Sequence, residues 1–200
     1  MKIAVFVSGR GSNLQAILDS QKEYKTVEVK AVISDKISCP AFQIADKYSI
    51  PAFSLGDKEG CTGYNELPGL LSKLEIEFIV LAGFLKLIPN EVIKRYSKKI
   101  INIHPALLPS FGGKGMYGMN VHKAVFESSA KVSGVTIHFV DETYDTGKII
   151  AQRCVDISDV KSAEEIAERV LKAEHELLPY VVNKFAEGNV KFVDNRVMVF

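Results

Sequence analysis

Short apolar runs that alternate with helical patterns constrain the fold of this chain more than any other feature. The run "FIVLA", Phe78–Ala82, is continuously apolar, as expected of a central parallel strand that is covered on both faces. Similar runs at Lys2–Val7, Val27–Ser34 and Ile100–His104 are separated by segments with helical spacing. Strands that alternate with helices predict a parallel sheet with right-handed crossovers.

The second half of the chain predicts longer elements of a different kind. Residues Gly134–Val140 and Lys148–Ile157 have the pattern of two strands, joined by the polar loop Asp141–Gly147. The residues Ser162–Glu165 form a capping box that opens a long amphipathic helix. Two short alternating runs within Lys191–Val199 predict a terminal hairpin.

These patterns together predict an α/β fold. We expect a Rossmann-like, mostly parallel twisted sheet that is flanked by helices, with an antiparallel C-terminal portion. A length of 200 residues suits one domain with a single core. We expect residues 1–200 to form that domain, with a nucleotide-binding-like half over 1–100 and a more irregular half over 101–200.

The composition disfavours several classes of partner and cofactor. The formal net charge is +1, so no global field favours nucleic acid or an anionic membrane. The cysteines Cys39, Cys61 and Cys154 form no CxxC pair, which argues against a disulfide framework or a zinc site. The N-terminal apolar stretch is too short for a signal peptide, and no run has the roughly 20 apolar residues of a membrane span. We therefore expect a cytoplasmic protein without a nucleic-acid or membrane partner.

The segment SGRGSN, residues 8–13, lies where a strand is predicted to turn into a helix. A glycine turn before a helix offers N–H groups and a positive dipole end, which suits a phosphate. The alternative is a tight turn that Ser12 or Asn13 caps. A dinucleotide site is disfavoured because Leu14 stands at its third glycine position. Residues 112–114 (GGK) could end the phosphate-binding loop of an NTPase. That loop is disfavoured because Leu108 occupies the position of its first glycine.

Asn102 and His104 are two residues apart at the end of a predicted strand. In an extended chain both side chains point to one side, and ligands of open α/β sheets bind beyond such strand ends. Pro105 favours extended geometry at His104. An imidazole with a reference pKa of about 6.5 exchanges protons near neutral pH, and an asparagine N–H stabilises an oxyanion. The alternative, a hydrogen-bonded core histidine beside a polar turn residue, stays open.

The loop DETYDTG contains three carboxylates, Asp141, Glu142 and Asp145. A carboxylate beside an imidazole favours the charged imidazolium and raises its pKa. One of these side chains is therefore a candidate partner for a histidine. The alternative is a solvated acidic loop without a partner.

Three further polar side chains lie at positions that we expect to be partly buried. His138 is on the strand before the acidic loop, and structural and functional roles are both open for it. His122 lies in a helix that we expect Asn120 to open, and structural hydrogen bonding is favoured. Glu174 borders the apolar stripe of the long helix, so its carboxylate needs a partner or a ligand. The scattered histidines show no metal-ligand spacing, and no metal is expected.

Five segments occur in the order seen in one known family: "VSGRGSNLQAIL", "VLAGFLKLIP", "INIHPALLPSFGGKGMYG", "VTIHFVDETYDTGKII" and "AEHELLPYVV". From Lys2 to about Glu187 the chain resembles the phosphoribosylglycinamide formyltransferases, a branch of the folate-dependent formyltransferases. The resemblance implies transfer of a formyl group from the co-substrate 10-formyltetrahydrofolate to the amine of glycinamide ribonucleotide. It also implies that residues 101–200 are the catalytic and folate-binding half. A monomer and a homodimer are both open.

The resemblance assigns roles to the matching positions of this chain. The phosphate of the ribonucleotide would be held by Gly11, Ser12 and Asn13, and the same substrate would meet Glu174. The catalytic residues would be Asn102, His104 and Asp145, with support from His138. The folate pocket would be lined by Leu85, Lys86, Leu87, Ile88 and Asn102.

Three positions depart from the family pattern. Cys61 stands where a basic residue is often found, so Lys58 is a candidate for that contact. Leu171 stands where a polar side chain is common, with Lys172 beside it as a candidate. The segment GGKGMYG is a longer variant of its loop, in which Lys114 is a candidate contact to phosphate or carboxylate.

The expected reaction is a direct transfer, with His104 as proton donor, Asn102 as oxyanion stabiliser and Asp145 raising the pKa of His104. A methionyl-tRNA formyltransferase would need a nucleic-acid-binding domain, for which too few residues follow Gly188. A formyltetrahydrofolate hydrolase would use water as nucleophile and would normally carry an additional N-terminal domain. A non-catalytic binding protein would not need the complete set of three polar side chains.

Overall fold

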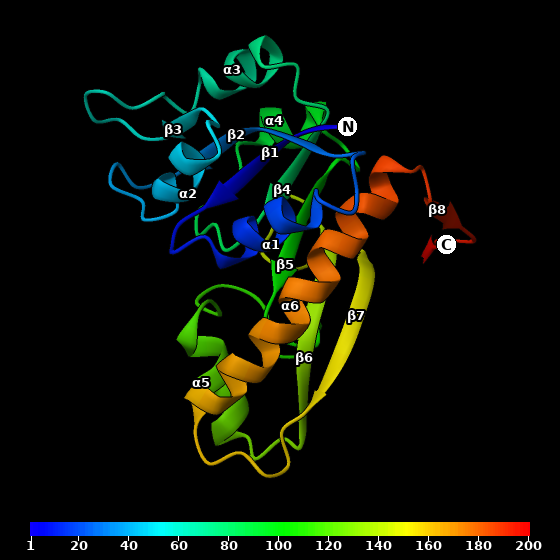
Figure 1. Ribbon diagram of the computed structural model, residues 1–200. Helices are drawn as coiled ribbons and strands as arrows, with labels where there is room; N and C mark the ends of the chain where they lie inside the picture. The colour runs from blue at the N-terminus through cyan, green and yellow to red at the C-terminus, as the bar shows by residue number, and fades with distance from the viewer. The chain divides into compact units, whose positions relative to one another are not determined.

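Strands and helices alternate from Lys2 to Glu127 in the computed structural model, which describes residues 1–200 (Figure 1). The chain divides into two units, Met1–Ile101 and Asn102–Phe200. The strands form one seven-stranded sheet, in the order β3-β2-β1-β4-β5-β6-β7, and a separate two-stranded sheet of β8 and β9. The prediction of a mostly parallel α/β sheet with an antiparallel C-terminal portion is confirmed. The single domain over residues 1–200 stays a prediction.

The first unit has a parallel sheet with a fully apolar centre. Strand β1 pairs in parallel with β2 and β4, and β2 pairs in parallel with β3. All four residues of β4 are buried, and the side chains from Ile3 to Val7 in β1 have no exposed surface. Continuous apolar strands of this kind are typical of a parallel sheet that is covered on both faces. The elements are β1 Lys2–Val7, α1 Ser12–Ser20, β2 Glu28–Ser34, α2 Phe42–Lys47, β3 Ala52–Ser54, α3 Leu67–Lys73, β4 Phe78–Leu81 and α4 Asn90–Arg95.

The second unit contains the antiparallel part. Strands β6 and β7 are antiparallel, and α6 contacts both of them (Figure 1). A small cluster of buried apolar side chains from α5, α6 and the segments that follow β5 and β7 completes this unit. The elements are β5 Ile100–His104, which begins in the first unit, α5 Met119–Glu127, β6 Val132–Phe139, β7 Ile149–Asp156, α6 Ala163–Ala186, β8 Val190–Val193 and β9 Arg196–Val199.

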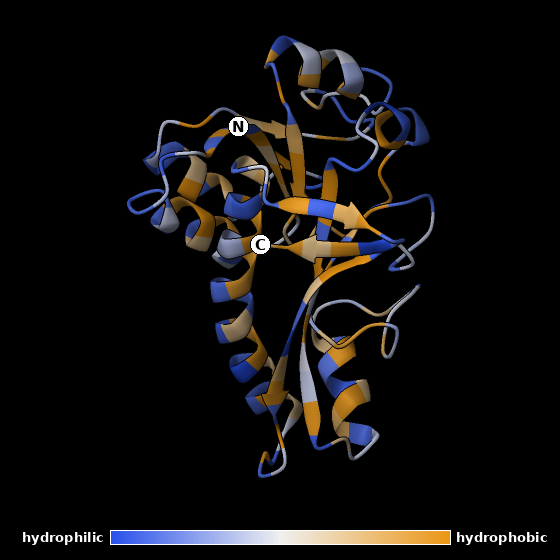
Figure 2. Ribbon diagram, turned by 90° about the vertical axis from the view of Figure 1, so that its right-hand side faces the viewer, coloured by the Kyte–Doolittle hydropathy of each residue, from blue (hydrophilic) through white to orange (hydrophobic).

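Helix α6 is amphipathic, as its spacing predicts. Hydrophilic and hydrophobic residues alternate along the long helix in Figure 2. Its N-cap is Ser162, whose hydroxyl accepts the Glu165 N–H at 3.2 Å, while the Glu165 carboxylate accepts the N–H of Lys161 at 3.0 Å. The predicted capping box is thus present with its second bond shifted by one residue. The helix continues through Pro179, and the predicted apolar stripe is buried at Ile166, Val170, Ala173, Leu177 and Val181.

Helix α3 begins later than its sequence pattern predicts, and helix α5 begins slightly earlier. The helical pattern over Tyr64–Leu74 becomes α3 only from Leu67, because Pro68 lacks an N–H donor and fits best in a first turn. Helix α5 begins after Gly118 and not at Asn120, where the sequence predicts its start. The Asn120 amide donates instead to the Gly115 carbonyl at 3.2 Å. No helix of the chain combines the length and the apolar character needed to cross a membrane.

Candidate functional site

In the second unit one carboxylate lies between two imidazoles. The Asp145 Oδ2 atom is 3.6 Å from His104 Nδ1, and its Oδ1 atom is 3.5 Å from His138 Nε2. The Asn102 amide is 3.1 Å from the same His138 Nε2 atom. Only 3% of each imidazole and 11% of the Asp145 side chain are exposed. The structure therefore brings together Asn102, His104 and Asp145, which the sequence predicts as a group. The predicted supporting residue, His138, contacts both Asn102 and Asp145.

Local backbone geometry explains how these side chains meet. Asn102 and His104 alternate with the buried Ile101 and Ile103 on β5, so both leave the strand on the same side. Asp145 has a left-handed backbone with a φ of 58°, which reverses the loop after β6. The Gly113 N–H donates to Asp145 Oδ2 at 2.8 Å and holds the carboxylate in place.

Two backbone carbonyls fix which ring nitrogen of each histidine carries hydrogen. The Phe111 carbonyl accepts from His104 Nε2 at 2.8 Å, and the Phe139 carbonyl accepts from His138 Nδ1 at 2.8 Å. A carbonyl oxygen only accepts, so both of these nitrogens carry a hydrogen. In the neutral rings, His138 Nε2 then accepts from the Asn102 N–H, and His104 Nδ1 is the nitrogen that gains a proton next to Asp145.

Burial and charge act in opposite directions on this cluster. Burial lowers the pKa of His104 below its ordinary value, and this outweighs the opposite effects of the Asp145 charge and the Phe111 carbonyl. Burial raises the pKa of the Asp145 carboxyl, but contacts with His138, the Gly113 N–H and the imidazole charges bring that pKa below its usual range. Asp145 thus acts on His104 in the predicted direction. Burial is nevertheless the larger effect, so the net pKa of His104 lies below its ordinary value in the free protein.

His122 also departs from its prediction. Its ring is only 6% exposed, and its Nδ1 atom has no hydrogen-bond partner, so the expected structural hydrogen bond is absent at that atom. Burial lowers the pKa of His122 to about 4, with a smaller contribution from the charge of His104. His122 is therefore a neutral ring at physiological pH.

The predicted phosphate loop lies in the first unit, between β1 and α1. Gly11 is the N-cap of α1 and has a φ of 80° without a side-chain capping bond. A methyl group at Gly11 would approach the Ala41 Cβ atom to 2.7 Å, so this turn requires glycine. Capping by Ser12 or Asn13 was the alternative, and neither is the N-cap. The phosphate contacts of Gly11, Ser12 and Asn13 stay a prediction.

The predicted folate segment follows β4 in the same unit. Leu85, Lys86 and Leu87 are exposed and Ile88 is buried. The Leu85 N–H donates to Ser8 Oγ at 3.0 Å, and Ser8 Oγ donates to Asp35 Oδ1 at 2.5 Å. Sequence reasoning missed this function of Ser8, although Ser8 lies within the quoted SGRGSN segment. The Ser8 hydroxyl links the start of the predicted folate segment to the end of β1.

The remaining predicted residues are dispersed. Glu174 is 8% exposed on α6, in agreement with its expected burial. Lys58 in the first unit and Lys114 and Lys172 in the second are exposed side chains. Their contacts with a substrate stay predictions. No group of three or more histidine, cysteine, aspartate or glutamate side chains is arranged to hold a metal ion.

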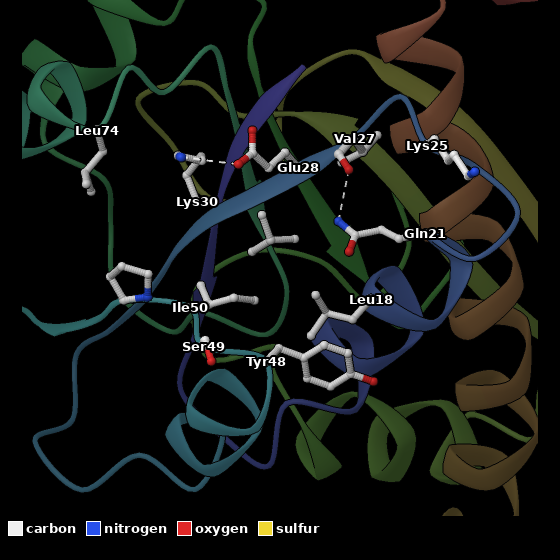
Figure 3. Close-up of a pocket in the computed structure, with 12 residues that line it drawn as sticks. Leu18, Gln21, Lys25, Val27, Glu28, Lys30, Tyr48, Ser49, Ile50 and Leu74 are labelled. Atoms are coloured by element: carbon white, nitrogen blue, oxygen red, sulfur yellow. Dashed lines mark hydrogen bonds and ion pairs between the residues drawn. The ribbon is translucent and has the colours of Figure 1, made fainter.

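A separate surface groove of about 460 Å³ lies in the first unit, beside β2 (Figure 3). The Gln21 amide donates to the Val27 carbonyl at 3.0 Å, and Lys30 pairs with Glu28 at 3.2 Å. None of its residues is among the predicted site residues. It is lined by Leu18, Gln21, Lys25, Val27, Glu28, Val29, Lys30, Tyr48, Ser49, Ile50, Pro51 and Leu74.

Comparison with known proteins agrees with this fold. The profile of the formyl transferase family matches residues 1–182, so the chain belongs to the formyl transferase family. Within it, the chain is similar to phosphoribosylglycinamide formyltransferase of Bacillus subtilis, with 36% identity over 92% of this chain and 93% of that protein. The crystal structure of phosphoribosylglycinamide formyltransferase from Anaplasma phagocytophilum has a TM-score of 0.88 and 32% identity, covering 99% of this chain and 92% of that one. The resemblance seen in the sequence is confirmed.

A plant relative is more similar in sequence but longer. The chain is 47% identical to the chloroplastic phosphoribosylglycinamide formyltransferase of Vigna unguiculata over 94% of its own length. It spans only 62% of that relative's length. The cytoplasmic location stays a prediction, since this relative is named as chloroplastic.

Proposed function

We propose that this protein transfers the formyl group of 10-formyltetrahydrofolate to the amine of glycinamide ribonucleotide, a step of purine biosynthesis. One observation carries the proposal: a buried carboxylate contacts two imidazoles, and an asparagine amide joins the same cluster, in a member of the formyl transferase family. The choice of acceptor rests on the bacterial relative of nearly equal length, which is named for that substrate.

The reaction begins with attack of the substrate amine on the formyl carbon. The tetrahedral intermediate has a negative oxygen, which needs a hydrogen-bond donor. The Asn102 amide has two N–H groups, and one donates to His138 at 3.1 Å. The second N–H is the donor that we assign to the oxyanion. Losing one such donor costs on the order of 10²–10³ in rate.

His104 carries the proton between the two substrates. The amine loses one proton as the new C–N bond forms, and the folate nitrogen gains one as the old C–N bond breaks. His104 starts as a neutral ring, because burial lowers its pKa, and it accepts the proton at Nδ1. Asp145, 3.6 Å away, stabilises the resulting imidazolium until the proton passes to the leaving nitrogen. Acid–base assistance of this kind contributes typically ~10²–10⁴-fold.

Substrate binding is assigned to the residues that the family resemblance indicates. The ribonucleotide phosphate binds the N–H groups around Gly11, Ser12 and Asn13, with Glu174 as a polar contact for the same substrate. The folate ring contacts Leu85, Lys86, Leu87 and Ile88. The lysines Lys58, Lys114 and Lys172 are candidates for phosphate or carboxylate contacts. Holding the two substrates close together and correctly oriented supplies much of the remaining rate acceleration.

One assay separates the proposed activity from its alternatives. The purified protein receives 10-formyltetrahydrofolate together with glycinamide ribonucleotide, with initiator tRNA, or alone, and release of tetrahydrofolate is followed. Release that depends on glycinamide ribonucleotide supports the proposal. Release without an acceptor would identify a hydrolase, and binding without release would identify a non-catalytic protein. A His104→Ala variant with normal turnover would refute His104 as the proton carrier.

A further inference from the structure

The C-terminal hairpin β8–β9 lies beyond residues 1–182, which the family profile matches, and it contacts the base of the loop that carries Asp145. The Phe192 ring of β8 stacks on Phe139, with the ring centroids 5.4 Å apart and the planes 21° apart. Phe139 is the last residue of β6 and lies two residues before Asp141, where the loop begins. Phe185 of α6 packs edge-on against the same ring, with centroids 5.8 Å apart. The C-terminal marker locates the hairpin in Figure 2.

The hairpin also contacts the other end of the loop. The Lys148 ammonium donates to the Asn195 carbonyl at 2.8 Å and to the Asn195 side-chain oxygen. The two ends of the loop are joined directly, since the Phe139 N–H donates to the Lys148 carbonyl at 2.9 Å. Gly147 leaves no room for a side chain, because an added methyl group would overlap the Phe139 carbonyl. Both ends of the loop are therefore fixed against one small hairpin.

The residues at the two ends of the loop are close in the chain to His138 and Asp145, which belong to the candidate site. The Phe139 carbonyl accepts from His138 Nδ1 at 2.8 Å, which keeps His138 Nε2 as the acceptor for Asn102. Asp145 is two residues before Gly147, and its carboxylate reaches both His104 and His138. We propose that the hairpin is a positioning element of the active site, in which Phe192 and Asn195 set the place of Asp145 and the orientation of His138. The catalytic meaning of this inference rests on the proposed function.

Matched aromatic substitutions on one hairpin test the proposal. Phe192→Ala removes the stacked ring, Phe192→Tyr restores it, and Lys148→Met removes the second tie at an exposed position. Phe200→Ala is the control, because Phe200 lies at the end of the same hairpin and is 59% exposed. We expect Phe192→Ala and Lys148→Met to lower kcat, by about tenfold for Phe192→Ala, with a small change in KM, since misplacement of about 1 Å costs up to 10²-fold. Phe192→Tyr and Phe200→Ala should retain wild-type kcat.

A titration of the histidine rings by NMR gives a readout that does not need turnover. The side chains whose charge acts on the His104 ring are Asp145 and His138, and the neutral His122 ring is affected by the charge of His104. If Phe192→Ala lets Asp145 recede, the His104 ring should titrate at lower pH than in the wild type, in the direction of an Asp145→Asn variant. Circular dichroism and thermal melting confirm that each variant is folded.

The outcomes are distinct. Unchanged kcat and unchanged ring titration in Phe192→Ala would overturn the proposal, and so would equal effects of Phe192→Ala and Phe200→Ala. A shifted titration in a protein that shows no formyl transfer would support the positioning role and refute the proposed function instead.

Discussion

Replacing Asp145 by asparagine tests the electrostatic basis of the site. The substitution keeps the side-chain shape and leaves an oxygen to accept the Gly113 N–H, which now binds Asp145 Oδ2 at 2.8 Å. Asparagine also tolerates the left-handed backbone at this position, where φ is 58°. Only the negative charge beside the two imidazoles is lost. Glu142→Gln removes a charge from the same loop at an exposed position and serves as the control.

The distance between the charges sets the magnitude. Two unit charges 3.6 Å apart, the distance from Asp145 Oδ2 to His104 Nδ1, interact by about 4–5 kcal/mol at an effective dielectric constant of about 20. Solvent screens this pair little, since 3% of the His104 and 11% of the Asp145 side chain are exposed. In the proposed mechanism the imidazolium forms during turnover, so the loss falls on the transition state. At about 1.4 kcal/mol per factor of ten, we expect kcat to fall by about 10³-fold.

The pH profile provides the second readout. The Asp145 charge raises the pKa of His104, so its removal leaves burial less opposed and moves that pKa further down. The neutral ring is the starting form, and activity therefore declines as pH falls through the His104 pKa. In Asp145→Asn the acid limb of kcat/KM should move to lower pH while the plateau falls. Release of tetrahydrofolate at a series of pH values measures both. A normal plateau with an unmoved acid limb would refute the reasoning, whereas Glu142→Gln should match the wild type.

Three further outcomes follow from burial and backbone geometry. The pKa of His122 is about 4 in the folded state and about 6.5 in the unfolded state. Between these pH values only the unfolded chain binds the proton, so the protein becomes less stable as the pH is lowered. In urea unfolding, the unfolding free energy of the wild type should fall by about 3 kcal/mol more between pH 7 and pH 4 than that of His122→Met; an equal slope in the two proteins would contradict this. Gly11→Ala should destabilise by about 2–4 kcal/mol and raise KM for the ribonucleotide, while Gly9→Ala, which meets no atom within 4 Å, should do neither. Ser162→Ala should lower the unfolding free energy by about 1 kcal/mol in thermal melts without changing kcat; no loss would mean that the hydroxyl does not cap α6.

Much of the fold was predictable because its signals are local. The run at Phe78–Ala82 needs only apolar continuity to predict the buried strand β4, and the spacing from Ile166 to Val181 predicts the stripe of α6. The start of α3 was less predictable. Its apolar spacing extends back to Tyr64, and only the steric demand of Pro68 moves the boundary to Leu67.

The site was predictable in its members and less so in its electrostatics. Strand alternation predicts that Asn102 and His104 share a side, and the family resemblance adds Asp145. The contacts of the Phe111 carbonyl and the Gly113 N–H come from a loop whose path no side-chain pattern encodes. The net pKa direction of His104 depends on how deeply the ring is buried, which is a property of the packed fold.

The left-handed backbone at Asp145 limits how this site can change during evolution or engineering. A φ of 58° is tolerated by aspartate and asparagine far better than by other side chains with a Cβ atom. Glutamate would have to adopt the same strained backbone and place its carboxylate one methylene further from the two imidazoles. The left-handed backbone therefore leaves aspartate as nearly the only acidic residue that suits position 145. A variant enzyme with a different proton affinity would have to acquire it through neighbouring groups, such as the donor at Gly113 or the burial of His104.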